Sequence, residues 1–95
     1  MSLPLTIGST ETMRLSITKD GLVWDLTGGT VVLRFVSPTG GTSSVNASSA
    51  YNGGADAAWT VASPAGTWTR AWDCTDAHGV RQVTQAVSFS VVASP

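Results

Sequence analysis

Apolar and polar residues alternate along short runs of this chain, and clusters of glycine or proline separate the runs. In residues 11–18, and again in residues 30–37, every second side chain is large and apolar. A period of two residues is typical of a β-strand that turns one face toward a core. The pattern of an amphipathic helix, with apolar residues at i, i+3, i+4 and i+7, is not found. We therefore expect an all-β protein.

The alternating runs predict about seven to eight antiparallel strands. They cover residues 3–7, 11–18, 22–26, 30–37, 43–47, 57–61, 67–74 and 80–92. Pro4 marks the first of them as an edge strand, since proline has no N–H to donate. Asp20-Gly21 supplies residues that tolerate the positive φ of a tight hairpin turn. Short strands at such spacing favour two sheets packed face to face, so we expect residues 1–95 to form a single β-sandwich domain.

The segment of residues 42–56 has the weakest pattern, because serine, asparagine and glycine dominate it. Only Val45 and Tyr51 are large apolar anchors there. We expect a short polar strand at residues 43–47, followed by a loop that is mobile or becomes ordered on a partner. Shortening such a loop should cost little stability. Tyr51 and Asn52 are therefore candidate interface residues.

The strand predicted at residues 67–74 places Trp68, Arg70 and Trp72 on one face. Two tryptophans favour the core, whereas a guanidinium between them does not. Either Arg70 lies at a sheet margin and stacks on a Trp ring, or a bulge shifts the register. Arginine and tryptophan are enriched at interface hot spots, which makes Arg70 and Trp24 further candidate interface residues.

Composition and charge limit the classes of partner. Charged residues are 12 % of the 95 residues, about half the usual share, and the net charge is −1. The cationic residues stand singly along the chain rather than in clusters; they are Arg14, Lys19, Arg34, Arg70 and Arg81. A nucleic-acid partner requires clustered cations, so none is expected. No apolar run is long enough for a signal peptide or a membrane span, so we expect a chain that stays soluble in the cytoplasm.

Residues that could carry out chemistry are few. Cys74 is the only cysteine, so no intrachain disulfide is possible, and we expect it to be a buried apolar residue. His78 stands four residues further on, in an expected turn, and Asp25 and Asp76 are expected to cap turns. Asp73, Asp76 and His78 are too few and too unevenly spaced for a metal site. We predict no catalytic, cofactor-binding or metal-binding residues, and hence no enzyme.

The order of several short motifs resembles that of a known family. The motifs are Gly8, Thr12-Met13-Arg14-Leu15, Asp20-Gly21, Asp25-Leu26-Thr27-Gly28-Gly29-Thr30-Val31, Pro64-Ala65-Gly66-Thr67-Trp68, Thr75-Asp76 with Gly79, and Phe89-Ser90-Val91. In this order they resemble the small immunoglobulin-like domains of tailed bacteriophages, typified by the N-terminal domain of the baseplate upper protein. The resemblance extends over nearly the whole chain and implies an immunoglobulin-like β-sandwich.

The resemblance also implies a function. Such domains are virion building blocks, either adaptors in the tail or baseplate or decoration (cement) proteins on the head, and they have no catalytic residues. The chain stops at Pro95 without a helical or receptor-binding extension, which favours a stand-alone adaptor or a decoration protein. The implied partners are other virion proteins, namely capsid, tail or baseplate subunits. The chain would be made in the host cytoplasm, occur in the virion in multiple copies or as a homo-oligomer, and contact neither nucleic acid nor membrane.

The alternative is a carbohydrate- or receptor-binding module, because exposed tryptophans stack on sugar rings. The chain has four tryptophans that could form such a platform: Trp24, Trp59, Trp68 and Trp72. Their exposure separates the two hypotheses.

Overall fold

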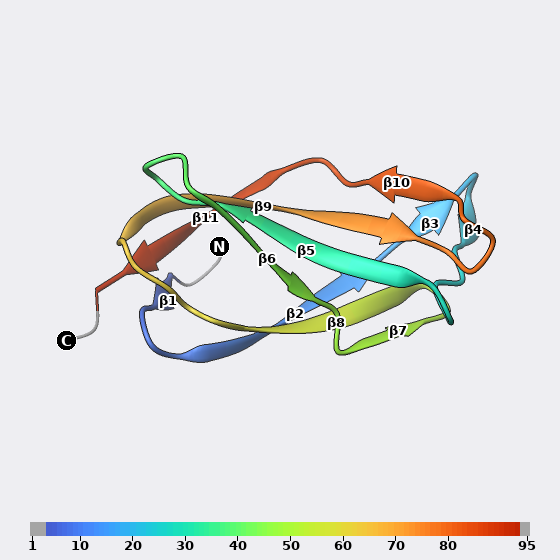
Figure 1. The fold of residues 1–95 in the computed structure, drawn as a ribbon, viewed down its shortest axis with the longest axis horizontal. Coiled ribbons are helices and arrows are strands. Elements are labelled where there is room, and N and C mark those ends of the chain that lie inside the picture. Colours follow the sequence, from blue (N-terminus) through green and yellow to red (C-terminus); the bar gives the residue numbers. More distant parts are fainter. Residues whose placement is uncertain (1–3, 94–95) are drawn as a thin grey trace.

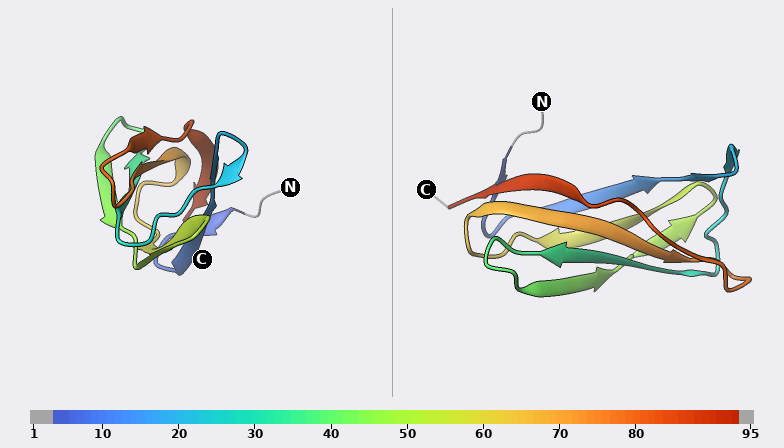
Figure 2. Two further views of the ribbon diagram at one scale, coloured as in Figure 1. Left: turned by 90° about the vertical axis from the view of Figure 1, so that its right-hand side faces the viewer. Right: turned by 90° about the horizontal axis from the view of Figure 1, so that it is seen from above.

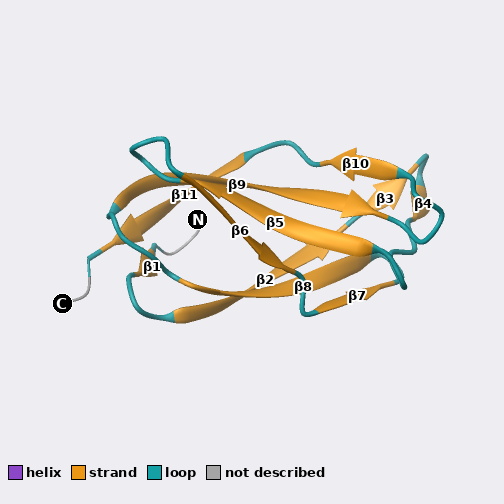
Figure 3. Ribbon diagram, in the orientation of Figure 1, coloured by secondary structure: helices purple, strands orange, loops and turns teal. Residues whose placement is uncertain are grey.

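Strands and isolated β-bridges account for 62 % of the described residues in the computed structural model, which covers residues 4–93 and contains no helix among them (Figure 3). The expected all-β class is therefore confirmed. The strands, in chain order, are β1 (Leu5–Thr6), β2 (Thr10–Ser16), β3 (Thr18–Lys19), β4 (Leu22–Val23), β5 (Thr30–Val36), β6 (Thr42–Asn46), β7 (Ser49–Tyr51), β8 (Gly54–Thr60), β9 (Gly66–Thr75), β10 (Arg81–Val83) and β11 (Val87–Val92).

Two curled sheets and one hairpin contain all of these strands (Figure 1). The larger sheet has the order β1-β11-β9-β5-β6, and β10 also pairs with β9. The smaller sheet has the order β2-β8-β7, and β3 pairs with β4 alone. The end-on view shows the strands surrounding a common interior (left panel of Figure 2). The arrangement is sandwich-like, with side chains of both sheets in one core.

The core is built from the inward positions of both sheets. It contains Met13, Leu15, Trp24, Leu26, Val31, Leu33, Phe35, Ala55, Ala57, Trp59, Val61, Trp68, Trp72, Cys74 and Val91. At one end, Phe35, Trp68 and Phe89 of the larger sheet surround Trp59 of the smaller one. The rings of Phe35 and Trp59 stack with centroids 4.2 Å apart, and the ring of Trp68 meets Trp59 edge-on at 5.4 Å. This aromatic cluster holds the two sheets together.

Local turn chemistry matches the sequence. Asp20 and Gly21 have φ values of 55° and 79° and join β3 to β4 as a two-residue hairpin loop, as predicted. The Asp25 carboxylate accepts a hydrogen bond from the Thr27 N–H at 2.9 Å, which confirms its expected capping role. Gly54 is required by space, because a Cβ there would lie 2.0 Å from the carbonyl oxygen of Leu15 on the paired strand.

The prediction of a loop after residue 47 is wrong. Residues 49–51 form β7, which pairs with β8, and Asn52 bridges to Asp25. The prediction that this segment can be shortened at little cost assumed a loop, whereas a deletion here would remove residues of a paired strand. The alternation of apolar and polar residues did not reveal this strand, because an edge strand depends on backbone hydrogen bonds more than on apolar side chains. Its small polar residues show little periodicity.

Three other boundaries differ from the predictions. The first strand begins at Leu5 and pairs in parallel with β11, so the larger sheet is mixed rather than purely antiparallel. Leu3 lies outside the described residues. The strand predicted at 80–92 is two strands, because the chain leaves the ladder at residues 84–86. The strand predicted at 22–26 stops at Val23, and Trp24 and Leu26 turn into the core.

We predict that Trp68→Ala costs about 3–5 kcal/mol of unfolding free energy, because it removes a large ring from the aromatic cluster. Trp68 is 3 % exposed and donates from Nε1 to the Pro64 carbonyl at 2.9 Å. Urea denaturation measures the loss. Val83→Ala, at a side chain that is 56 % exposed, is the control and should change stability by less than about 0.5 kcal/mol. Equal losses for the two variants would contradict the packing described above.

Candidate functional site

The outward face of the larger sheet has a charged cluster at its centre. Cross-strand register places Arg34 opposite Ala71, Val32 opposite Asp73, and Arg81 opposite Thr75. Since Val31, Leu33 and Phe35 point into the core, their neighbours on β5 point outward. The same alternation turns Asp73 of β9 and Arg81 of β10 outward, where residues diagonal to each other on adjacent strands come within reach.

Asp73 is enclosed by two guanidinium groups. Arg81 donates to both carboxylate oxygens, from Nε to Oδ1 at 2.8 Å and from Nη2 to Oδ2 at 2.7 Å. Arg34 donates to Oδ2 from Nε at 3.2 Å and from Nη2 at 3.1 Å. The Asp73 side chain is only 7 % exposed, because the two arginine side chains cover it. The hydrogen bonds from Arg81, supported by those from Arg34, lower the pKa of Asp73 to about 2 despite its burial.

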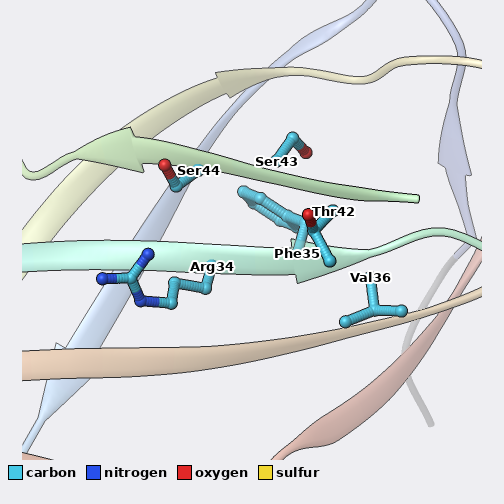
Figure 4. A pocket seen from close by; sticks show the side chains of 6 residues that line it. All are labelled: Arg34, Phe35, Val36, Thr42, Ser43 and Ser44. Atoms are coloured by element: carbon cyan, nitrogen blue, oxygen red, sulfur yellow. The ribbon is translucent and has the colours of Figure 1, made fainter. Parts of the chain in front are cut away.

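This cluster leaves one net positive charge and free donors on the surface. The side chains of Arg34 and Arg81 are 56 % and 62 % exposed. Val36, at 42 % exposed, and Val83 lie on the same face. Beside them a shallow hollow of about 420 Å³ opens between β5 and β6, where Arg34 extends toward β9 and hydroxyl side chains follow β6 (Figure 4). Fixed guanidinium groups among small apolar and hydroxyl side chains are suited to a protein contact.

Arg70, predicted as an interface residue, lies on the inward face of β9 and is half-buried. The pairing of β9 with β5 and β11 is continuous there, so the strand has no bulge. Its guanidinium Cζ is 5.6 Å from the centre of the Phe89 ring, and Nη1 contacts the sulfur of Met13. The first predicted alternative is observed only in part: the guanidinium lies over an aromatic ring, but the ring is Phe89 rather than a tryptophan, and β9 is a central strand of the larger sheet rather than its margin.

The other predicted interface residues lie elsewhere. Trp24 is 6 % exposed, and its Nε1 donates to Asp76 Oδ2 at 3.0 Å, so it tethers the β3–β4 hairpin to the turn after β9. The prediction that Trp24 lies on an exposed interface is therefore wrong. Tyr51 is half-buried and donates its hydroxyl to Asp56 at 2.9 Å, while Asn52 is exposed beside it. Arg70 belongs to the other sheet, so the four residues do not form one surface.

The few chemically reactive residues have structural surroundings. Asp76 Oδ1 accepts from the N–H groups of His78 and Val80 at 2.9 and 3.0 Å, which confirms its expected role in the turn. Asp73 is held by arginines, and residues 4–93 contain no group of three potential metal ligands. Cys74 is fully buried, as expected, and burial together with the nearby Asp73 raises the pKa of its thiol to about 11.

The Arg34–Asp73–Arg81 cluster was missed at the sequence level. Alternation alone placed Asp73 on the face away from Trp68 and Trp72, and Arg34 on the outward face of its strand. What the sequence lacked was the pairing of β5 and β10 with β9, which joins residues far apart in the chain.

No family model, curated protein or solved structure matches this chain. Within residues 4–93 there is also no helix of the length and apolar character needed to cross a bilayer.

We predict that the Cys74 thiol of the native protein does not react with Ellman's reagent at pH 8, since it is buried and its pKa is about 11. It should react fully once the protein is unfolded in guanidinium chloride. Rapid reaction of the native protein would show that the thiol is open to solvent.

We predict that Asp73 stabilises the fold in a pH-dependent way. Its folded pKa of about 2 lies below the ordinary value of 3.8, so its contribution is complete above pH 5 and is lost as the pH falls from about 4 toward 2. Solvent around the two arginines limits this contribution to about 1–2 kcal/mol.

Denaturation midpoints at pH 5 and pH 2 measure this effect in the wild type and in Asp73→Asn. The wild type should lose more stability over that interval than the variant, whose side chain does not titrate. Arg81→Gln should raise the pKa of the Asp73 carboxyl, and carbon-detected NMR of the carboxyl carbon as a function of pH measures this pKa. Parallel pH profiles of wild type and Asp73→Asn would contradict the assignment.

Proposed function

We propose that this chain is a non-enzymatic structural subunit of a bacteriophage virion, with an immunoglobulin-like fold, that assembles with other virion proteins through the outward face of its larger sheet. The observation that carries the proposal is the Arg34–Asp73–Arg81 cluster. It presents rigidly held donors and exposed valines on a broad sheet face. Capsid, tail or baseplate subunits are the partners in view.

The strand order supports the immunoglobulin-like part of the proposal. Such sandwiches place strands B, E and D in one sheet and strands G, F and C in the other, with C′ added beside C in variable-type domains. Here β2-β8-β7 and β11-β9-β5-β6 follow the same order when β5 is taken as C and β9 as F. The β3–β4 hairpin and β10 are additions to that plan.

The motifs that resemble phage domains support the virion part. Asp20-Gly21 forms the β3–β4 turn, and Asp25 caps the bend before β5. Pro64 accepts the Trp68 indole hydrogen bond at the corner into β9. These three motifs thus have structural roles at corners of the fold, where a family of shared architecture keeps such residues. A decoration protein of the head and an adaptor of the tail both fit this architecture.

The carbohydrate-binding alternative is not favoured by the tryptophans. Each of the four is at most 7 % exposed, so none offers a ring face to a sugar.

The test is incorporation into particles. Virions purified from cells infected with the virus that encodes this chain should contain the protein, detected by mass spectrometry, and cryo-microscopy should show its density on a head, tail or baseplate. Absence of the protein from the particles would overturn the proposal.

A matched pair of variants tests the docking face. Val36→Glu introduces a charge on the outward face of the larger sheet and should lower incorporation at least tenfold. Ala58→Glu introduces the same charge at an exposed position of β8 in the smaller sheet and should leave incorporation unchanged. Thermal unfolding establishes that both variants fold. Equal incorporation of both would remove the outward face of the larger sheet as the docking surface.

A further inference from the structure

The seam between the two sheets is open along β2. A groove of about 390 Å³ lies there, lined by Arg14 and Ser16 of β2, Arg70 and Trp72 of β9, and Thr84 and Gln85 of the segment between β10 and β11. The opening has a local cause. Residues 84–86 leave the ladder, and Thr84 alone keeps contact with β9, donating its N–H to the Trp72 carbonyl and accepting the Trp72 N–H on Oγ1, both at 2.9 Å.

Arg70 is a cation in this groove, and it has no counter-charge among the residues that the structure describes. Among residues 4–93, Arg14 pairs with Asp56 at 3.1 Å, and Arg34 and Arg81 both pair with Asp73. Arg70 has no carboxylate within 4.0 Å in the same part of the chain. It is half-buried against Phe89 and Met13, which hold the guanidinium but do not neutralise it. A partly desolvated cation of this kind is stabilised by an anion that enters from the groove.

The edge of β2 beside the groove offers a second kind of contact. β2 pairs with β8 on one side, and no other described strand pairs with it. An unpaired strand edge presents a row of N–H and C=O groups that can bind an extended chain. The edge runs over seven residues, Thr10–Ser16, and Arg14, Leu15 and Ser16 line the groove as well. Backbone pairing and the free charge of Arg70 are therefore available to one ligand.

We propose that this groove binds an extended acidic segment of a neighbouring virion subunit, which pairs with the free edge of β2 and places one carboxylate on Arg70. The source of the segment rests on the function proposed above, whereas the binding chemistry rests on the groove alone. A single unpaired guanidinium suits one carboxylate, because Asp56 already neutralises Arg14.

The test uses two synthetic peptides, acetyl-Thr-Val-Thr-Glu-Thr-Val-Thr-amide and its counterpart with glutamine in place of glutamate. Isothermal titration calorimetry on the wild-type protein should give at least tenfold tighter binding of the glutamate peptide. In ¹H–¹⁵N spectra, amide signals of β2 should shift on binding. No binding of the glutamate peptide, or equal affinity for both peptides, would overturn the proposal.

Variants assign the preference to Arg70. Arg70→Gln should abolish the difference between the peptides, and Arg70→Lys, which keeps the charge without the planar fork, should retain part of it. Lys19→Gln makes the same change in net charge in the β3–β4 hairpin and should retain the full preference. Thermal unfolding shows which variants are folded. A full preference in folded Arg70→Gln would refute the role of Arg70.

This outcome is separable from the function proposed above. If the glutamate peptide does not bind but Val36→Glu still lowers incorporation into virions, only the proposal for the groove is rejected. Peptide binding that depends on Arg70, in a protein absent from virions, would keep the groove and reject the virion as the source of its ligand.

Discussion

The insertion of Trp59 among three aromatic rings of the opposite sheet is the contact on which the rest of the structure depends. The smaller sheet contributes mostly alanine, methionine and leucine to the core, so this indole supplies much of its apolar contact with the larger sheet. No disulfide assists it, since Cys74 is the only cysteine. The stack of Trp59 on Phe35, and its edge contacts with Trp68 and Phe89, fix how the two sheets face each other.

Once the inward positions are fixed by this packing, the outward ones follow, because successive side chains of a strand point to opposite faces. Burying Trp72 and Cys74 turns Asp73 outward, and the adjoining strands bring Arg34 and Arg81 to it. The same alternation directs Arg70 inward, into the seam. The protein therefore has a rigid pair of arginines that share one carboxylate on the sheet face, and an arginine between the sheets that has no carboxylate partner among residues 4–93. The first suits a broad contact, and the second suits a single acidic group.

Much of the fold could be predicted from the chain, for reasons visible in particular residues. Val31, Leu33 and Phe35 are spaced for one face of a strand, and all are buried. Asp20-Gly21 permits the backbone angles that a two-residue hairpin requires. The strand β7 could not be predicted in this way, because its stability comes from backbone pairing with β8 rather than from its own side chains. The candidate site was equally hidden, since its three charged residues come from three strands.

The sequence by itself determined the secondary-structure class, the inward and outward faces of the longest strands and the positions of the tightest turns. These depend on residues near one another in the chain, through side-chain periodicity and local backbone angles. Only the tertiary structure decided which strands are neighbours, and with it the enclosure of Asp73, the burial of Trp24 and the open seam beside Arg70. Those features depend on contacts between distant segments, and a pattern of period two specifies a face but not the strand that lies beside it.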